Sequence, residues 1–281
     1  MENKILIPTD FSDNAWNAVV YALKLFADEP CTFYLLNAVN IKYTAFANFS
    51  NKLLKTMCDA EMKTLVELKQ LAESSDANAN HEFKIIQSTE NLNSAINMVV
   101  RDKAINLIIM GTKGHTGTKE FFFGSNTVQL INHIKDCPIL VIPEEFEFVK
   151  PTQIAFPTHF NRSYSKEELM PLMRATELFN SKIRIVHINE EEQLTTLQEE
   201  HMKELDSILL DYDHSFHWMP NYANKSAEIN DFIQELNIDM LAMINYKHSF
   251  IENILREPVV NKIGFHPIVP FLVIPKKHTA S

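Results

Sequence analysis

The chain has 281 residues, of which 46% are hydrophobic and 22% charged, and only five are glycine. This composition excludes collagen-like, low-complexity and disordered proteins, and the length predicts about two domains. The formal net charge of −10 makes nucleic acid a poor candidate partner, because a face that binds phosphates along a duplex needs a surplus of Lys and Arg.

Short apolar runs alternate with longer helical patterns along the first half of the chain, which is typical of a parallel sheet with helices on both faces. The runs are rich in Ile, Leu, Val and Phe and show little polar alternation, as expected of buried parallel strands. We expect strands at about 3–8, 32–38, 83–87, 106–110 and 139–142.

Helix signals lie between these runs. Ser12 is a candidate N-cap for a helix that reaches about residue 26, and residues 46–73 have the pattern of a long helix. Asn91 or Asn93 could cap a helix that ends near residue 103. Ser125 is expected to begin the next one.

The second half repeats the first. The motif ILIPTDF at 5–11 is echoed by IAFPTHF at 154–160, and CPILVIP at 137–143 is echoed by VPFLVIP at 269–275. The repeat predicts two copies of one unit, with domains over 1–146 and 151–281. The matching strands are expected near 153–157, 183–188, 215–219, 239–243 and 270–274.

The cysteines and the apolar runs bear on the compartment. Cys31, Cys58 and Cys137 are too widely spaced for a disulfide framework or a C-x-x-C pair. No apolar run is long enough for a signal peptide or a membrane-spanning helix. We therefore expect a cytoplasmic protein with no membrane partner.

Glycine clusters after the fourth expected strand. Gly111, Gly114, Gly117 and Gly124 fall within 14 residues. A glycine-rich loop between the carboxyl end of a parallel strand and a helix exposes backbone N–H groups that can hold phosphate. A flexible surface loop is the alternative. The loop contains neither the P-loop motif nor the G-x-G-x-x-G motif of dinucleotide-binding folds.

In these segments the first copy resembles the universal stress protein family. The resemblance lies in ILIPTDFS at 5–12, IMGTKG at 109–114, FGSNT at 123–127 and CPILVIP at 137–143. The second copy resembles the family in layout and strand pattern only. The resemblance implies an α/β fold of two tandem Rossmann-like domains, of the adenine nucleotide α-hydrolase-like type. Each would have a five-stranded parallel sheet with helices on both faces.

The resemblance also implies an adenine-nucleotide site in the first copy. The residues that would contact the base and the ribose are Pro8, Thr9, Asp10, Ala38, Val39, Met110 and Gly111. Those that would surround the phosphates are Lys113, Gly114, Gly124, Ser125, Asn126 and Thr127. Two of these assignments have plainer alternatives: Asp10 as a turn carboxylate and Lys113 as a solvated loop residue.

The second copy has lost the groups that such a site needs. Gly111 aligns with Ile244, and Asp10 aligns with His159. Gly124 and Ser125 are replaced by Glu257 and Pro258, which would repel phosphate and remove an N–H donor. The second domain is therefore expected to be degenerate and retained for packing or partner binding.

We expect a stress-response regulator that binds ATP, ADP or AMP in its first domain, with Mg²⁺ able to bridge the phosphates. No residue is placed as a base for water attack, so no catalytic residue is assigned and any ATP hydrolysis should be slow. One rival interpretation is a nucleotide-free scaffold or chaperone-like protein with a remnant loop. Another is an ATP pyrophosphatase, which TDFSD at 9–13 does not favour.

Two further expectations concern partners and metals. The apolar strands that end the two copies should pair as an intramolecular pseudo-dimer, with homodimerisation as a further option and the protein partner unknown. The motif His214-x-x-His217 suggests a metal at first sight. Residues three apart on a strand face opposite sides, so no metal site is expected there.

Overall fold

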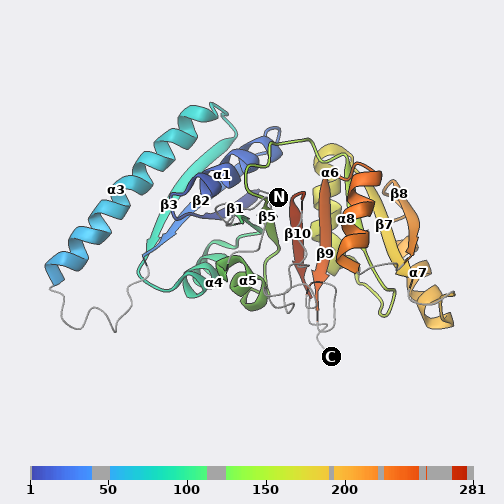
Figure 1. Ribbon diagram of the computed structural model, residues 1–281. Coiled ribbons are helices and arrows are strands. Elements are labelled where there is room, and N and C mark those ends of the chain that lie inside the picture. The colour runs from blue at the N-terminus through green and yellow to red at the C-terminus, as the bar shows by residue number, and fades with distance from the viewer. Residues whose placement is uncertain are drawn as a thin grey trace. The chain divides into compact units, whose positions relative to one another are not determined.

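The computed structural model describes residues 2–39, 51–112, 125–189, 193–220, 225–246, 251 and 268–276 (Figure 1). The described residues form two compact units, one up to Glu145 and the other from Phe146 onward. Both units have the expected α/β fold, and each is described by itself below. Within the described ranges, none of the helices combines the length and the apolar character needed to cross a membrane.

The first unit contains a five-stranded parallel sheet in the order β3-β2-β1-β4-β5. Its strands are β1 (Asn3–Pro8), β2 (Cys31–Ala38), β3 (His81–Ser88), β4 (Leu107–Gly111) and β5 (Ile139–Ile142). Its described helices are α1 (Asp13–Leu25), α3 (Asn51–Ser75), α4 (Leu92–Lys103) and α5 (Ser125–His133). The first two cover one face of the sheet and the other two cover the opposite face (Figure 1).

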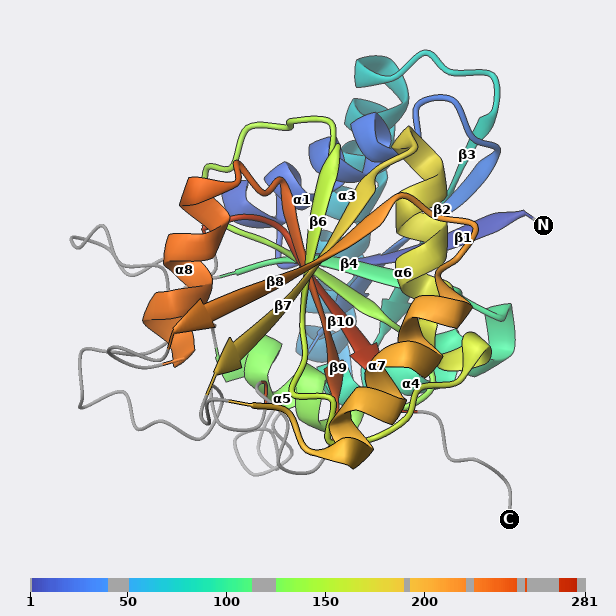
Figure 2. The same cartoon turned by 90° about the vertical axis from the view of Figure 1, so that its right-hand side faces the viewer.

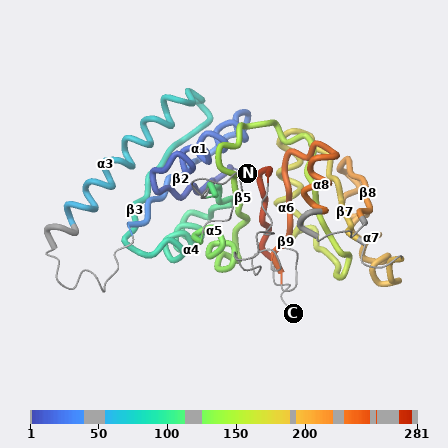
Figure 3. Tube along the Cα trace, in the orientation of Figure 1, coloured from blue at the N-terminus to red at the C-terminus, as the bar shows by residue number. Residues whose placement is uncertain are grey.

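The helices form where the sequence provides caps and apolar faces. Ser12 caps α1 by accepting a hydrogen bond from Ala15 N, as predicted, and Asn91 rather than Asn93 caps α4. The buried positions of α1 recur at helical spacing, so the helix packs closely on β4. The trace of α3 runs along β3 (Figure 3). The expected start of this helix at 46–50 lies outside the described residues.

The second unit repeats this topology, with strand order β10-β9-β6-β7-β8. Its strands are β6 (Gln153–Pro157), β7 (Lys182–Asn189), β8 (His214–Pro220), β9 (Met240–Asn245) and β10 (Phe271–Pro275). Its described helices are α6 (Lys166–Phe179), α7 (Thr196–Ile208) and α8 (Lys225–Glu235). Figure 2 shows α6 and α7 on one side of the strands and α8 on the other.

The core of each unit follows from its strands. The inner strands β1, β4, β6 and β9 carry almost continuous buried runs, because a parallel sheet is covered on both faces. The carboxyl ends of the parallel strands lie at one edge of each sheet. In open α/β sheets this edge is where ligands bind.

Candidate functional site

Three hydrogen bonds that involve Thr9 stabilise the turn after β1. Thr9 N donates to Leu36 O at 2.8 Å, and Phe11 N donates to Thr9 Oγ1 at 3.0 Å. Asn37 Nδ2 donates to Thr9 O at 3.2 Å. Because Thr9 is buried, its side chain stabilises the turn and does not lie on the open surface.

Asp10 is the exposed residue of this turn. Its Oδ1 accepts hydrogen bonds from Ser12 N at 3.1 Å and Ser12 Oγ at 2.5 Å. Ser12 Oγ in turn accepts from Ala15 N at the start of α1. The structure thus gives Asp10 a turn role, which holds its carboxylate at the ligand edge of the sheet. Its contact with a ribose stays a prediction.

Three buried oxygen atoms near this edge have no hydrogen-bond partner among the described residues: Asn14 Oδ1, Asn37 Oδ1 and Thr112 Oγ1. Asn37 contacts Thr9, and Thr112 directly follows β4. An unsatisfied buried acceptor costs about 1–3 kcal/mol, so such atoms call for a bound molecule or water. None of the three was predicted, although Thr112 is a polar residue directly after an apolar strand and Asn37 is a polar residue within one.

Gly111 lies at the end of β4, where α1 approaches the strand closely. A Cβ atom at this position would lie 2.6 Å from Asn14 O and 2.8 Å from Asn14 Oδ1. Real Cβ atoms essentially never come this close, so helix packing by itself requires glycine here. Met110 is buried and can offer a ligand little besides its backbone.

One backbone group at the end of β2 is already hydrogen-bonded to the neighbouring strand β3. Val39 N donates to Ser88 O at 2.8 Å, so this amide hydrogen is used in pairing with the end of β3. Ala38 and Val39 are both half-buried. The backbone group that Val39 can offer to a base is therefore its carbonyl. Pro8 is buried at the end of β1 and contributes to the wall of this edge.

The start of α5 carries the remaining predicted phosphate contacts that the structure describes. Ser125 and Asn126 are exposed in the first turn, whereas Thr127 is buried. The first turn has no acidic residue, so the positive end of the helix dipole is not neutralised. Lys113, Gly114 and Gly124 lie outside the described residues.

The second unit keeps the same turn after β6. Phe160 N donates to Thr158 Oγ1 at 3.0 Å, and Thr158 N donates to Val186 O at 2.9 Å. His187 Nδ1 donates to Thr158 O at 3.0 Å and thus takes the role that Asn37 has in the first unit. His159 stands where the first unit has Asp10.

A cluster of charged and aromatic side chains joins the segment between β6 and α6 to the end of β9. The Cζ atom of Arg162 lies 4.5 Å from the ring centroids of both Tyr164 and Tyr246, and its Nη1 donates to Glu168 Oε2 at 2.8 Å. Burial raises the pKa of both tyrosine hydroxyls, so Glu168 is the anion that balances Arg162. Tyr246 follows β9 at the point where the glycine loop follows β4 in the first unit.

The other replacements in the second unit are described only in part. Ile244 lies buried in β9 at the position equivalent to Gly111. It can be accommodated because α6 begins four residues later than α1 relative to the shared turn. Glu257 and Pro258 lie outside the described residues.

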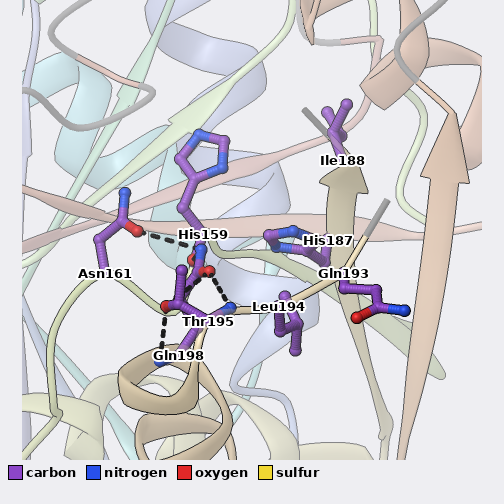
Figure 4. Close-up of a pocket in the computed structure, with 8 residues that line it drawn as sticks. All are labelled: His159, Asn161, His187, Ile188, Gln193, Leu194, Thr195 and Gln198. Atoms are coloured by element: carbon purple, nitrogen blue, oxygen red, sulfur yellow. Dashed lines mark hydrogen bonds between the residues drawn. The ribbon is translucent and has the colours of Figure 1, made fainter. Parts of the chain in front are cut away.

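A cavity of about 220 Å³ lies in the second unit, at the carboxyl ends of β6 and β7 and the start of α7 (Figure 4). The residues that line it are His159, Asn161, His187, Ile188, Gln193, Leu194, Thr195 and Gln198. The sequence indicates a degenerate second unit, and its patterns did not predict the cavity. No local sequence motif predicts this cavity, because the residues that line it come from three separate elements.

The paired histidines of β8 have separate partners. His214 Nε2 is 2.9 Å from Asp206 Oδ1, whereas His217 Nε2 is 2.8 Å from Ser215 Oγ. In the part of the chain that the structure describes, no group of three His, Cys, Asp or Glu side chains is arranged to hold a metal ion.

Comparisons with known proteins agree with this architecture. A family model described as the universal stress protein family matches residues 1–143. Universal stress protein MJ0531 from Methanocaldococcus jannaschii is 29% identical over 147 residues, which cover 50% of this chain and 81% of that protein.

Two solved structures are similar over both units. A universal stress protein from Archaeoglobus fulgidus matches with a TM-score of 0.66 and 14% identity, over 98% of this chain and 96% of that one. A protein of unknown function from Pseudomonas aeruginosa matches with a TM-score of 0.59 and 11% identity, over 97% and 92% of the two chains. At these identities the matches establish the fold.

Proposed function

The chain belongs to the universal stress protein family, and on that premise we propose that its first domain binds an adenine nucleotide at the carboxyl edge of its sheet. The observation that carries this proposal is a set of three buried acceptors that have no partner among the described residues, namely Asn14 Oδ1, Asn37 Oδ1 and Thr112 Oγ1. A nucleoside presents the complementary donors, namely an exocyclic amine and ribose hydroxyls.

The phosphates would extend toward the first turn of α5. Ser125 and Asn126 are exposed there, and the helix start favours negative charge. The glycine-rich segment that precedes the helix in sequence adds backbone N–H donors, and Lys113 adds a positive charge. Mg²⁺ would be held mainly by the phosphates, with Asp10 as the carboxylate that follows β1.

In this function the nucleotide acts as a regulatory ligand in the cytoplasm. The three cysteines are unpaired thiols, which fits a reducing compartment. The groups available bind the ground state and the transition state of phosphoryl transfer about equally, so they lower the dissociation constant without raising the rate. Hydrolysis would therefore be slow.

Calorimetric titration of the full chain with ATP, ADP, AMP and GTP tests the proposal. We expect one adenine nucleotide per chain, and the comparison with GTP measures the preference for the base. Thr112→Val removes one unpartnered acceptor and should weaken adenine-nucleotide binding by about threefold to tenfold, which corresponds to about 1 kcal/mol. Thr176→Val, which alters a buried threonine of the second domain, is the control and should leave the affinity unchanged.

The phosphate half of the site is tested separately. Gly124→Val should abolish ATP binding, because a side chain would block close approach of phosphate to the backbone. A full chain that binds no adenine nucleotide would favour the scaffold interpretation. Phosphate release at about 1–10³ per second that depends on Asp10 or Ser125 would instead place the protein among enzymes.

A further inference from the structure

We propose that the second domain has a binding site of its own, for a small uncharged heterocycle, in the cavity between β6, β7 and α7. The proposal rests on the walls of this cavity and does not depend on nucleotide binding by the first domain. The cavity, about 220 Å³, is smaller than the roughly 300–1,000 Å³ typical of sites for drug-sized ligands. A molecule of one or two rings is the size that it fits.

The cavity is built around one fixed amide. Gln198 Nε2 donates to His159 O at 3.0 Å and to Asn161 Oδ1 at 3.2 Å. Gln198 Oε1 accepts from Thr195 N at 2.9 Å and from Thr195 Oγ1 at 3.0 Å. All hydrogen-bonding positions of the Gln198 amide are thus used within the protein. These bonds connect the start of α7 to the turn after β6. This part of the wall is therefore held by hydrogen bonds within the protein.

The walls select against charged ligands. Among the described residues that line the cavity, none is Asp, Glu, Lys or Arg. The positive end of α7 does not compensate, because Thr195 Oγ1 caps the helix and Glu199 lies in its first turn. A charged group that enters without a counter-ion loses its hydration and gains little in return.

The same walls favour a flat ring. The rings of His159 and His187 are nearly perpendicular, at 87°, with centroids 6.0 Å apart, and Phe160 stacks on His187 at 5.3 Å. Ile188 and Leu194 add apolar surface, and Figure 4 shows His187 and Leu194 across the cavity from Asn161. Most of the lining is polar, and the two imidazole rings together with the amides of Asn161 and Gln193 match the polar edges of a heterocycle.

The two units thus offer different chemistry at equivalent positions. In the first unit this edge has the carboxylate of Asp10 and the amide of Asn37, whereas the second unit has His159 and His187 there. Asn37 and His187 both donate to the carbonyl group of the turn threonine. The second unit therefore has imidazole rings where the first unit has a carboxylate and an amide. For this reason we expect a neutral ligand in the second unit.

The test uses the full chain with ¹³C-labelled histidine and the probes adenine, uracil and nicotinamide. We expect at least one probe to shift the resonances of His159 and His187, which His159→Gln and His187→Asn identify. Calorimetry should show the same probe binding once per chain. Failure of all three probes would overturn the proposal.

Two matched variants locate the site. Leu194→Trp places a large side chain in the cavity and should weaken probe binding at least tenfold. Leu197→Trp lies in the same helix start but is 56% exposed and does not line the cavity, so it should bind the probe as the wild type does. Equal binding by both variants would contradict the assignment. If Leu194→Trp unfolds, His159→Asp, which adds a charge at the rim, provides the same comparison.

The variant Thr112→Val distinguishes the two domains, because residue 112 lies in the half of the first site that would hold the base. Weaker binding of ATP with unchanged binding of the probe would support two independent sites. Equal weakening of both would mean that the probe occupies the first domain and would overturn the proposal. AMP that displaces the probe from the Gly124→Val variant as effectively as adenine would refute the requirement for an uncharged ligand.

Discussion

Phe11 and Phe160 adopt the same left-handed backbone conformation at equivalent positions of the two units, with φ angles of 64° and 55°. Each donates its N–H to the Oγ1 atom of the threonine two residues earlier, at 3.0 Å. A side chain in this conformation costs about 1–2 kcal/mol, and the hydrogen bond to threonine offsets part of that cost. The backbone of the turn is therefore common to both units, and the residue between, Asp10 or His159, is what differs.

Replacing Gly111 by Ala should destabilise the first unit by about 1–3 kcal/mol, because the new methyl group would overlap Asn14. The variant is to be unfolded in urea in a Trp218→Phe background, where the remaining Trp16 reports on α1 of the first unit. Adding Asn14→Ala should restore little stability, since the nearest atom is the backbone oxygen of residue 14. Full restoration would show that the clash is with the side chain.

Arg162→Ala should destabilise the second unit by roughly 3 kcal/mol, because it leaves the buried carboxylate of Glu168 without a counter-ion. Urea unfolding in a Trp16→Phe background, followed through Trp218, measures the effect. Arg162→Met combined with Glu168→Gln removes both charges and should recover much of the loss. A double variant no more stable than the single one would mean that Arg162 acts by packing between the tyrosines.

Cys58 should react with iodoacetamide before the other two cysteines. It is half-exposed in α3, whereas Cys31 and Cys137 are buried. Burial raises the pKa of Cys31 to about 12, with Glu29 adding to the shift, and burial also raises the pKa of Cys137. Both thiols are therefore protonated and inaccessible at pH 8. Mass spectrometry of the native chain should find one modified site, and the urea-unfolded chain should show three.

His217 should make the second unit less stable as the pH falls. Burial lowers the pKa of His217 below its ordinary value of 6.5, and the charge of Arg184 lowers it further. The unfolded chain then binds the proton more readily, so stability is present above pH 6.5 and is lost as the pH falls toward the pKa of the folded state. The free energy of unfolding of His217→Gln, measured through Trp218 between pH 7.5 and 5, should decline less than that of the wild type. Parallel curves would contradict the assignment.

The fold could be predicted from sequence because its signals are local. Each of the ten expected strands lies within two residues of an observed one, and Ser12 caps α1 as predicted. Continuous apolar runs, N-caps and an internal repeat depend on neighbours along the chain. The turn that follows β1 also lies where the motif at 5–11 predicts it, whereas its role in ligand binding stays a prediction.

The sequence by itself determined the α/β class with a parallel sheet, the duplication and the difference in glycine content between the two copies. Only the tertiary structure decided which atoms meet. Gly111 faces Asn14, Asn37 reaches Thr9, and Gln198 joins the turn after β6 to the start of α7. These contacts join residues from 28 to 97 positions apart. They depend on strand register and helix position, which periodicity does not encode. For the same reason a domain that had lost its phosphate motif could still contain an unpredicted cavity.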